Sequence, residues 1–435
     1  MGKQWFKNGK RLLIDGVRCL SDECPCVEPT CKYIYYYDTE GDDSDGLTRA
    51  TAFSSITKAI QACVSKSIST QCAECFIIIC CSDFLINDYK NIYTNISTTR
   101  RSICMIGEGE VIASWTYEYG VSIGYIRNID ISYKKITLNI DDTGNTSRDV
   151  QVYISGAYDL TVNLISDNPN HPRYAIQPTT YCAENAGFND FINVAFNITN
   201  DEAYGGLIKQ LLDLRLGYGT TYTYNTIKNI TFGTFTQDIY IFCRDTIEDI
   251  DWSLPANTDP EDYSSIDISL SALYVLNVKI TSSALPGRLL FNRVLNMADC
   301  DIEFRGKNAR VQTGVCTMSN CTFSLSTSLT YSLQYSASRR DGYISDCTFS
   351  SVQYGDDYFF SSEVVYLTNG WGSNTYLNNI EIRNSTFTHQ GDSRSEQDYG
   401  VIIDYFNVVS YNSTYSGGPN FAGPALVNHG SFDEM

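Results

Sequence analysis

A short pattern of polar and apolar positions recurs along most of this chain. It reads Asn or Asp, then an apolar, a polar and a second apolar residue, and the last copy follows it more weakly. Successive copies begin 20 to 38 residues apart. The eleven copies begin at Asn128, Asp159, Asn193, Asn229, Asp249, Asn277, Asp299, Asn320, Asp346, Asn384 and Asn412.

The pattern predicts a stack of β-coils. Its alternation has period two, so the apolar residues of each copy point to one face of a strand and the polar residue to the other. A lone strand of this kind cannot bury its apolar face, whereas parallel stacking buries all copies together. The leading Asn or Asp suits a tight corner because its short side chain tolerates left-handed φ. We therefore expect an all-β solenoid.

A second region, near the start, has its own order of motifs. An acidic Gly-rich turn, Asp38–Gly46, precedes a segment in which Phe53, Ile56, Ala59, Ile60 and Cys63 share one helical face. An apolar strand at 76–79 and the segment Ile106-Gly-Glu-Gly109 follow.

This order resembles the opening of the pectate-lyase-like family. The resemblance covers about residues 34 to 415 and implies a single-stranded right-handed parallel β-helix. In that family the helix plugs the open end of the coil, where unpaired strand edges would otherwise invite association. We accordingly divide the chain into residues 1–32, a basic Cys-containing module; 33–115, the cap and first coils; 116–415, the β-helix body; and 416–435, a Gly/Pro-rich tail that leaves the repeat.

Composition narrows the function classes. The formal net charge of −19 argues against non-specific nucleic-acid binding, and no apolar run is long enough to span a membrane. The first residues lack the apolar stretch of a secretory signal, so we expect a route to the surface without one. Among the 16 cysteines, Cys300, Cys321 and Cys347 fill the same inward slot of consecutive copies, which predicts stacked core thiols.

Residues 1–32 differ from the body. Asn8-Gly9 and Asp15-Gly16 are hairpin-turn signals between short apolar runs, and the segment is basic. Four cysteines follow: Cys19, Cys24, Cys26 and Cys31. They could bind zinc together, form local disulfides or remain free thiols. Such a module resembles the attachment segments that fasten phage and virus spikes to a particle, which implies virion or surface proteins as partners.

Catalytic motifs of the family are missing. Its lyases use an Arg base with calcium-binding Asp residues, and its hydrolases use clustered Asp residues with Gly-His-Gly and Arg-x-Lys elements; the sequence has neither set. A carboxylate pair for glycoside hydrolysis is nevertheless available in Asp356 and Asp357. The same region offers side chains that could stack on or bond a sugar: Tyr354, Tyr358, Trp371, Arg339 and Arg340. The alternative is a solvated acidic turn.

Two other acidic segments have a chemical and a plain interpretation. Acidic residues alternate with apolar ones in the segment Arg244–Trp252. The segment is either a second candidate for the catalytic carboxylates or a strand whose acids occupy the outward positions. The turn before the helix has the oxygen density of a calcium loop, without the bidentate Glu of an EF-hand, and it also suits a solvated turn. Its carboxylates are Asp38, Glu40, Asp42, Asp43 and Asp45.

These observations predict a structural or adhesive β-helix of a virion or cell surface. It would be anchored by residues 1–32 and bind a glycan or a protein partner through its loops. The resemblance implies a tailspike- or fibre-like homotrimer. The alternatives are a polysaccharide-degrading tailspike, acting as lyase or glycoside hydrolase through a carboxylate pair, and a repeat protein that only scaffolds a partner.

Overall fold

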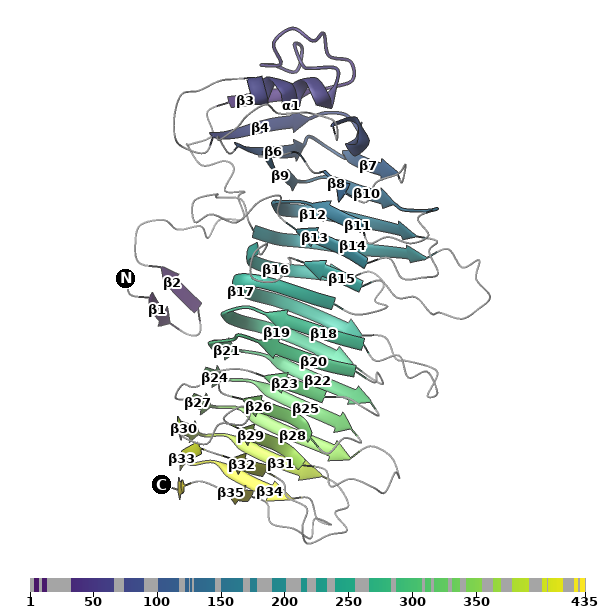
Figure 1. Cartoon of the computed structure of the whole chain (residues 1–435). Helices are drawn as coiled ribbons and strands as arrows, with labels where there is room; N and C mark the ends of the chain where they lie inside the picture. Colours follow the sequence, from purple (N-terminus) through teal and green to yellow (C-terminus); the bar gives the residue numbers. More distant parts are fainter. Residues whose placement is uncertain are drawn as a thin grey trace. The chain divides into compact units, whose positions relative to one another are not determined.

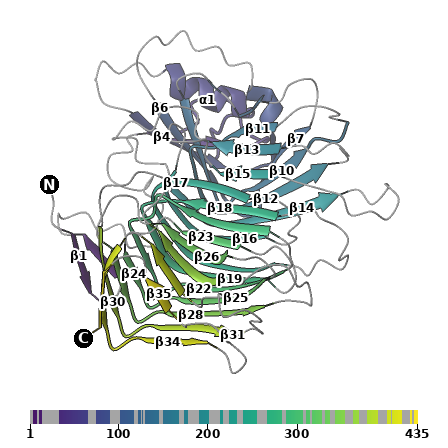
Figure 2. The same cartoon turned by 60° about the horizontal axis from the view of Figure 1, so that its bottom comes forward.

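The computed structural model describes residues 4–7, 10–13, 33–65, 74–89, 101–116, 122–124, 126, 129–144, 150–166, 173–177, 190–200, 213–216, 224–232, 239–254, 266–282, 287–306, 310–313, 317–327, 331–336, 342–353, 363–368, 378–390, 401–404, 406–417, 426–428 and 431–434. The chain divides into two units, Met1–Thr236 and Gln237–Met435. Each unit is a stack of parallel strands, shown in two views in Figures 1 and 2.

In the first unit, strands of successive coils pair in parallel along three files. File A holds β3 (Tyr33–Tyr37), β4 (Glu74–Cys80), β6 (Arg101–Gly107) and β9 (Ile129–Lys134), then the first parts of β12 (Gly156–Ser166), β14 (Asp190–Asn200) and β16 (Tyr224–Phe232). File B holds β5 (Phe84–Leu85), β7 (Ile112–Thr116) and β10 (Thr137–Asp141), then the later parts of β12, β14 and β16. File C holds β8 (Ser122–Ile123), β11 (Val150–Tyr153), β13 (Arg173–Gln177) and β15 (Asp213–Leu216).

The second unit repeats this arrangement from β17 (Ile239–Leu254), which contributes to all three files. File A continues through β19 (Tyr274–Ser282), β21 (Asn296–Ala298), β24 (Thr317–Ser319), β27 (Gly342–Ser345), β30 (Asn378–Arg383), β33 (Phe406–Tyr411) and β36 (Ser431–Glu434). File B continues through β19, β22 (Asp301–Gly306), β25 (Thr322–Thr327), β28 (Thr348–Gln353), β31 (Thr386–Gln390) and β34 (Thr414–Gly417). File C is β18 (Ile266–Ser271), β20 (Gly287–Asn292), β23 (Arg310–Thr313), β26 (Tyr331–Ser336), β29 (Glu363–Thr368), β32 (Val401–Asp404) and β35 (Leu426–Asn428). The predicted parallel β-helix is confirmed.

The structure describes strands near both ends of the chain, within residues 1–32 and within residues 416–435. β1 (Gln4–Lys7) and β2 (Lys10–Leu13) pair antiparallel in a two-stranded sheet of their own, as expected for the first two strands of residues 1–32. Within residues 416–435, β35 and β36 pair in parallel with β32 and β33 and so continue the coil. No helix of the described ranges is long and apolar enough to cross a membrane.

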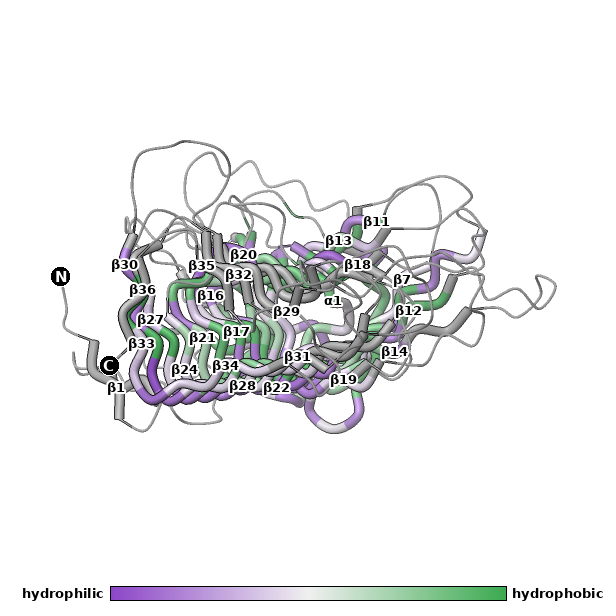
Figure 3. Tube along the Cα trace, turned by 90° about the horizontal axis from the view of Figure 1, so that it is seen from below, coloured by the Kyte–Doolittle hydropathy of each residue, from purple (hydrophilic) through white to green (hydrophobic). Residues whose placement is uncertain are grey.

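The interior of each coil is filled by the alternate, inward residues of its strands. In file B of the second unit, Phe323, Phe349, Phe387 and Tyr415 stack with ring centroids 4.7–5.3 Å apart and ring planes within 7–11°. Figure 3 shows hydrophobic positions inside the coil and hydrophilic ones along the outer edge of β22 and β28. The period-two alternation of the sequence therefore separates core from surface.

The predicted stack of thiols is present beside these rings. Cys300, Cys321 and Cys347 are free and buried in successive coils. Their S–H groups donate to backbone carbonyls two residues earlier, at 3.3, 3.2 and 3.1 Å respectively. The hydrogen bond with Cys321 and burial both raise the pKa of Cys347. The stack therefore consists of buried thiols that behave as small core residues.

From Lys135 to Asn412, one residue with positive φ separates file A from file B in each coil. In ten coils it is Asn or Asp, with φ between 48° and 56°, and it is the first residue of a sequence copy from Asp159 to Asn412. These residues tolerate the left-handed conformation better than other non-glycine residues do. The first copy is out of register, because Ile129–Lys134 lies in file A and Lys135, with φ 51°, occupies the corner of that coil.

The corner side chains form a ladder of amides along the stack. Each Asn donates from Nδ2 to the side-chain oxygen of the previous corner in the same unit at 2.7–3.1 Å: Asn193 to Asp159, Asn229 to Asn193, Asn277 to Asp249, Asn320 to Asp299, Asn384 to Asp346 and Asn412 to Asn384. An ionised Asp accepts but cannot donate. The ladder of hydrogen bonds is therefore interrupted between Asn277 and Asp299 and between Asn320 and Asp346.

Filling one gap should stabilise the protein. We expect Asp346→Asn to raise the free energy of unfolding by about 0.5–1.5 kcal/mol, because the new amide can donate to Asn320 Oδ1 and still accept from Asn384. The measurement is denaturant unfolding followed by circular dichroism. Asp301→Asn, an exposed carboxylate in strand β22 two coils earlier, makes the same charge change away from the ladder. Equal effects of the two substitutions would contradict the ladder's role.

A short helix lies at the β3 end of the first unit (Figure 1). Helix α1 (Ile56–Ser65) buries Ile56, Ala59, Ile60 and Cys63, as the apolar face predicts. Phe53 departs from the prediction, because it precedes the helix and bridges to Tyr37 of β3. The predicted helix is thus present, and it begins three residues after Phe53.

Candidate functional site

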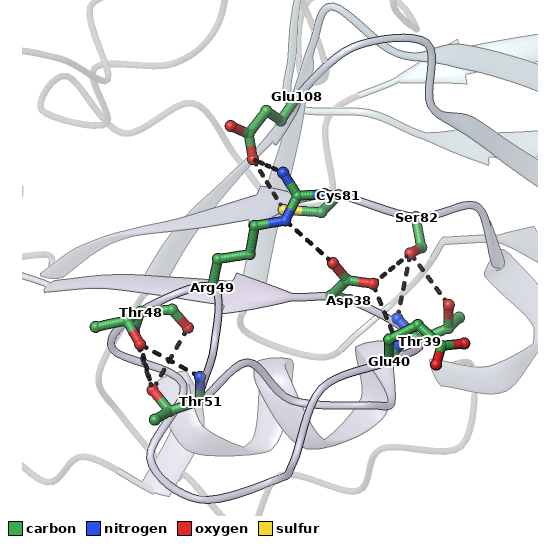
Figure 4. Close-up of polar contacts among 9 residues, drawn as sticks. All are labelled: Asp38, Thr39, Glu40, Thr48, Arg49, Thr51, Cys81, Ser82 and Glu108. Atoms are coloured by element: carbon green, nitrogen blue, oxygen red, sulfur yellow. Dashed lines mark hydrogen bonds and ion pairs between the residues drawn. The ribbon is translucent and has the colours of Figure 1, made fainter.

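The acidic turn that precedes α1 meets the ends of the first strands of file A. Asp38 follows β3, Cys81 follows β4 and Glu108 follows β6, so stacking brings three residues from successive coils into one row. Backbone bonds fix the row, with the N–H of Cys81 donating to Tyr37 O at 2.9 Å. We call these three residues, together with Arg49 and Ser82, the cap cluster (Figure 4). Its geometry therefore depends on strand register.

Arg49 lies across this row. Its Nε is 3.4 Å from Asp38 Oδ2 and its Nη1 is 3.7 Å from Glu108 Oε2, while 61% of its side chain is exposed. On the other side, the Ser82 hydroxyl donates to Asp38 Oδ1 at 2.9 Å. The Ser82 hydrogen bond is the largest cause that lowers the pKa of Asp38. The cluster thus ties the cap loop to two successive turns of the coil.

The remaining carboxylates of the turn are engaged within the loop. Asp43 accepts from Ser54 N at 2.7 Å and from Lys58 Nζ at 2.6 Å, and the Lys58 hydrogen bond leads the causes that lower the pKa of Asp43 to about 2. Asp42 Oδ1 accepts from Ser44 N at 2.9 Å and Asp45 Oδ1 from Leu47 N at 3.0 Å.

A calcium ion would need several of these oxygens to converge. Within the part of the chain that the structure describes, no three His, Cys, Asp or Glu side chains are gathered so as to hold a metal ion. Glu40 meets Asp38 only through its backbone N–H, which donates to Asp38 Oδ1 at 3.2 Å. The carboxylates face hydrogen-bond donors of the loop, and the calcium site stays a prediction.

The half-buried Cys81 is the thiol of the cap cluster. Its thiol donates to Glu108 Oε2 at 3.0 Å. Burial, followed by the hydrogen bond and charge of Glu108, raises the pKa of Cys81 to about 12. The thiolate is the reactive form, so Cys81 is a poor nucleophile near neutral pH. The contacts of Cys81 therefore join two successive coils.

Removing the Glu108 charge should activate this thiol. We expect Glu108→Gln to lower the pKa of Cys81 and raise its alkylation by iodoacetamide at mildly alkaline pH, by about tenfold for each unit of the fall. Peptide mapping by mass spectrometry follows Cys81 alone. Glu110→Gln, an exposed carboxylate of the same turn, is the control. Equal rates in the two variants would refute the contact.

The pKa of Cys81 also sets a stability trend. A thiol whose pKa is raised on folding contributes stability that is present below its unfolded value, near 8.5, and is lost as pH rises towards about 12. Wild-type stability should therefore fall across this alkaline range, and Cys81→Ser should show a smaller fall.

The sugar-cleaving candidates lie outside the described residues. These are Asp356, Asp357, Tyr354 and Tyr358, together with Trp371, Arg339 and Arg340. The zinc candidates Cys19, Cys24, Cys26 and Cys31 lie outside them too. The second acidic segment is described: Arg244–Trp252 lies in β17, where Ile247, Ile250 and Trp252 are buried and Asp251 is exposed. That pattern fits the outward positions of a strand.

A partly exposed aromatic and charged cluster in the second unit has no counterpart in the sequence-based candidates. The Arg383 guanidinium lies 4.6 Å from the ring centroid of Tyr411 in the next coil. Its Nε also pairs with Glu381, and this hydrogen bond raises the pKa of Arg383. Tyr343 of the previous coil lies in register with Glu381. We call Tyr343, Glu381, Arg383 and Tyr411 the Tyr–Arg cluster.

The Tyr–Arg cluster is chemically suited to contact a partner. Its residues lie on the outer face of file A and are partly or fully exposed. The Tyr ring and the Glu carboxylate hold the guanidinium in one orientation, which lowers the entropy cost of contact. Tyr and Arg are also among the residues that most often dominate binding interfaces. Comparisons with protein-family models, curated proteins and solved structures found no match to this chain.

Proposed function

We propose that this chain is a structural and adhesive β-helix of a virion or cell surface. Residues 1–32 fasten it to other proteins of the particle, and exposed side chains of its coils bind a glycan or a protein partner. The pectate-lyase-like resemblance of residues 34 to 415 supports a tailspike- or fibre-like member that assembles as a homotrimer.

The Tyr–Arg cluster is the observation that supports this proposal best. It offers an oriented guanidinium, a carboxylate and aromatic rings on the outer face of a coil that is rigid because its strands are hydrogen-bonded to both neighbours. Sugars and proteins are both recognised by such combinations of aromatic faces and planar polar groups. The cap cluster, by contrast, is engaged with its own loop.

Binding to a glycan array and to host-cell surface protein tests the adhesive role. We expect Arg383→Ala and Tyr411→Ala to weaken binding, while Arg49→Ala, which removes an exposed arginine of the cap cluster, leaves it unchanged. Reducing ends and unsaturated products are followed in the same incubations. Absence of any binding contradicts adhesion, and product release identifies the polysaccharide-degrading alternative.

Deleting residues 1–32 tests the anchor. The truncated chain should keep the β signal in circular dichroism and lose attachment to the particle. Attachment at the wild-type level would overturn the anchoring role.

A further inference from the structure

The outer face of file B in the second unit carries two rows of hydroxyls. One row is Thr322, Thr348, Thr386 and Thr414, and the next is Ser324, Ser350, Thr388 and Ser416. Register pairing places each member directly over the next, at the strand spacing of about 4.8 Å. All eight are partly or fully exposed. We call these rows the hydroxyl face.

The hydroxyl face is flat and regular. The aromatic side chains on the opposite side of the same strands keep their ring planes within 7–11° across four coils, so the strands twist little from one coil to the next. The threonine side chains are stiff at χ1 because they are β-branched. The rows are therefore straight and their hydroxyls are held in repeating positions.

The threonine hydroxyls of this face are open to a ligand. Among the described residues, the Oγ1 atoms of Thr322, Thr348, Thr386 and Thr414 make no hydrogen bond. In the second row, Ser416 Oγ donates to Thr388 Oγ1 at 3.3 Å and Ser350 Oγ donates to Phe323 O at 3.4 Å. The face begins sharply, because Asp301 and Glu303 of the preceding coil hold the positions in register with Thr322 and Ser324. It is an uncharged surface on a chain of net charge −19.

We propose that the hydroxyl face binds a neutral linear polysaccharide whose chain lies along the coil axis. A surface that repeats one group per coil gives equal contacts to a ligand that also repeats, and each added sugar gains a further hydroxyl partner. The lack of charge on the face selects a neutral chain, because an acidic polymer gains no cationic partner there and is repelled by the acidic body. This inference rests on the proposed adhesive function and names its ligand class.

Affinity as a function of chain length tests the proposal. The probes are neutral glucan oligosaccharides from disaccharide to octasaccharide, and galacturonate oligosaccharides of the same lengths, each immobilised for biolayer interferometry. We expect affinity to rise with neutral chain length until the four coils are covered, and acidic chains to bind more weakly. Thr348→Val with Thr386→Val should weaken long-chain binding about tenfold, through two lost hydrogen bonds.

The matched control is Thr137→Val with Thr161→Val, a register pair at the equivalent outer positions of file B in the first unit. It should leave binding unchanged, and circular dichroism checks that both double variants fold. Binding that is independent of length, stronger for acidic chains or equal in the two double variants would overturn this inference while leaving adhesion intact. Binding to no glycan of any kind would overturn the glycan part of the proposed function as well.

Discussion

Phe387→Ala is expected to lower the free energy of unfolding by about 3–5 kcal/mol. Phe387 is fully buried, with its ring 4.7 Å from Phe349 below and 5.1 Å from Tyr415 above. Truncation removes the apolar area and also leaves a cavity between two coils, since neighbouring strands are held by their ladders and cannot close over it. Both aromatic contacts are lost, which adds to the cost.

Denaturant unfolding and thermal melting measure this loss. Thr388→Ala, at the next position on the outward face of β31, is the control and should stay within about 0.5 kcal/mol of wild type. Phe387→Leu should fall between the two, because it keeps part of the volume. A loss for Phe387→Ala no larger than for Thr388→Ala would show that the ring is not in the core.

Asn384→Leu is expected to cost about 2–4 kcal/mol although the residue is exposed. Asn384 has φ 48°, and forcing a leucine into the left-handed region costs about 1–2 kcal/mol. The substitution also removes two rungs of the corner ladder, the bond to Asp346 and the bond from Asn412, each 3.1 Å long. Each rung contributes about 0.5–1.5 kcal/mol.

Asn384→Gly separates these two causes. Glycine keeps the left-handed conformation without strain, so it should lose only the hydrogen bonds and lie between wild type and the leucine variant. Unfolding in denaturant gives the three values. A leucine variant as stable as the glycine variant would contradict the backbone argument, and a glycine variant as stable as wild type would contradict the ladder.

The repeat could be predicted because its cause is local. A left-handed corner favours Asn or Asp, and the strand after it must alternate, so ten corners can be predicted from short stretches of sequence. The sequence does not show that the first copy lies in file A, because file A strands alternate in the same way as file B strands. The true corner of that coil is Lys135, a residue type that carries no signal for positive φ. The spacing of Phe53 matches the helical face and so predicts a place in the helix, whereas Phe53 pairs with Tyr37 before the helix begins.

The clusters could not be read from the sequence for a different reason. Arg383 and Tyr411 are 28 residues apart, and Cys81 and Glu108 are 27 apart, so each contact depends on the length of one whole coil. Coil lengths vary with the insertions between strands. The hydroxyl face was hidden similarly, because its rows appear only when β25, β28, β31 and β34 are placed in register.

The central claim is that strands distant in sequence stack in parallel and in the stated register. A double-mutant cycle between Phe349 and Phe387, using Leu at both positions, tests it most directly. We predict a coupling free energy of about 0.5–1.5 kcal/mol for this pair. Phe323 and Phe387, which are two coils apart, should be additive within about 0.5 kcal/mol. No coupling between Phe349 and Phe387, or a stronger one between Phe323 and Phe387, would contradict the stacking.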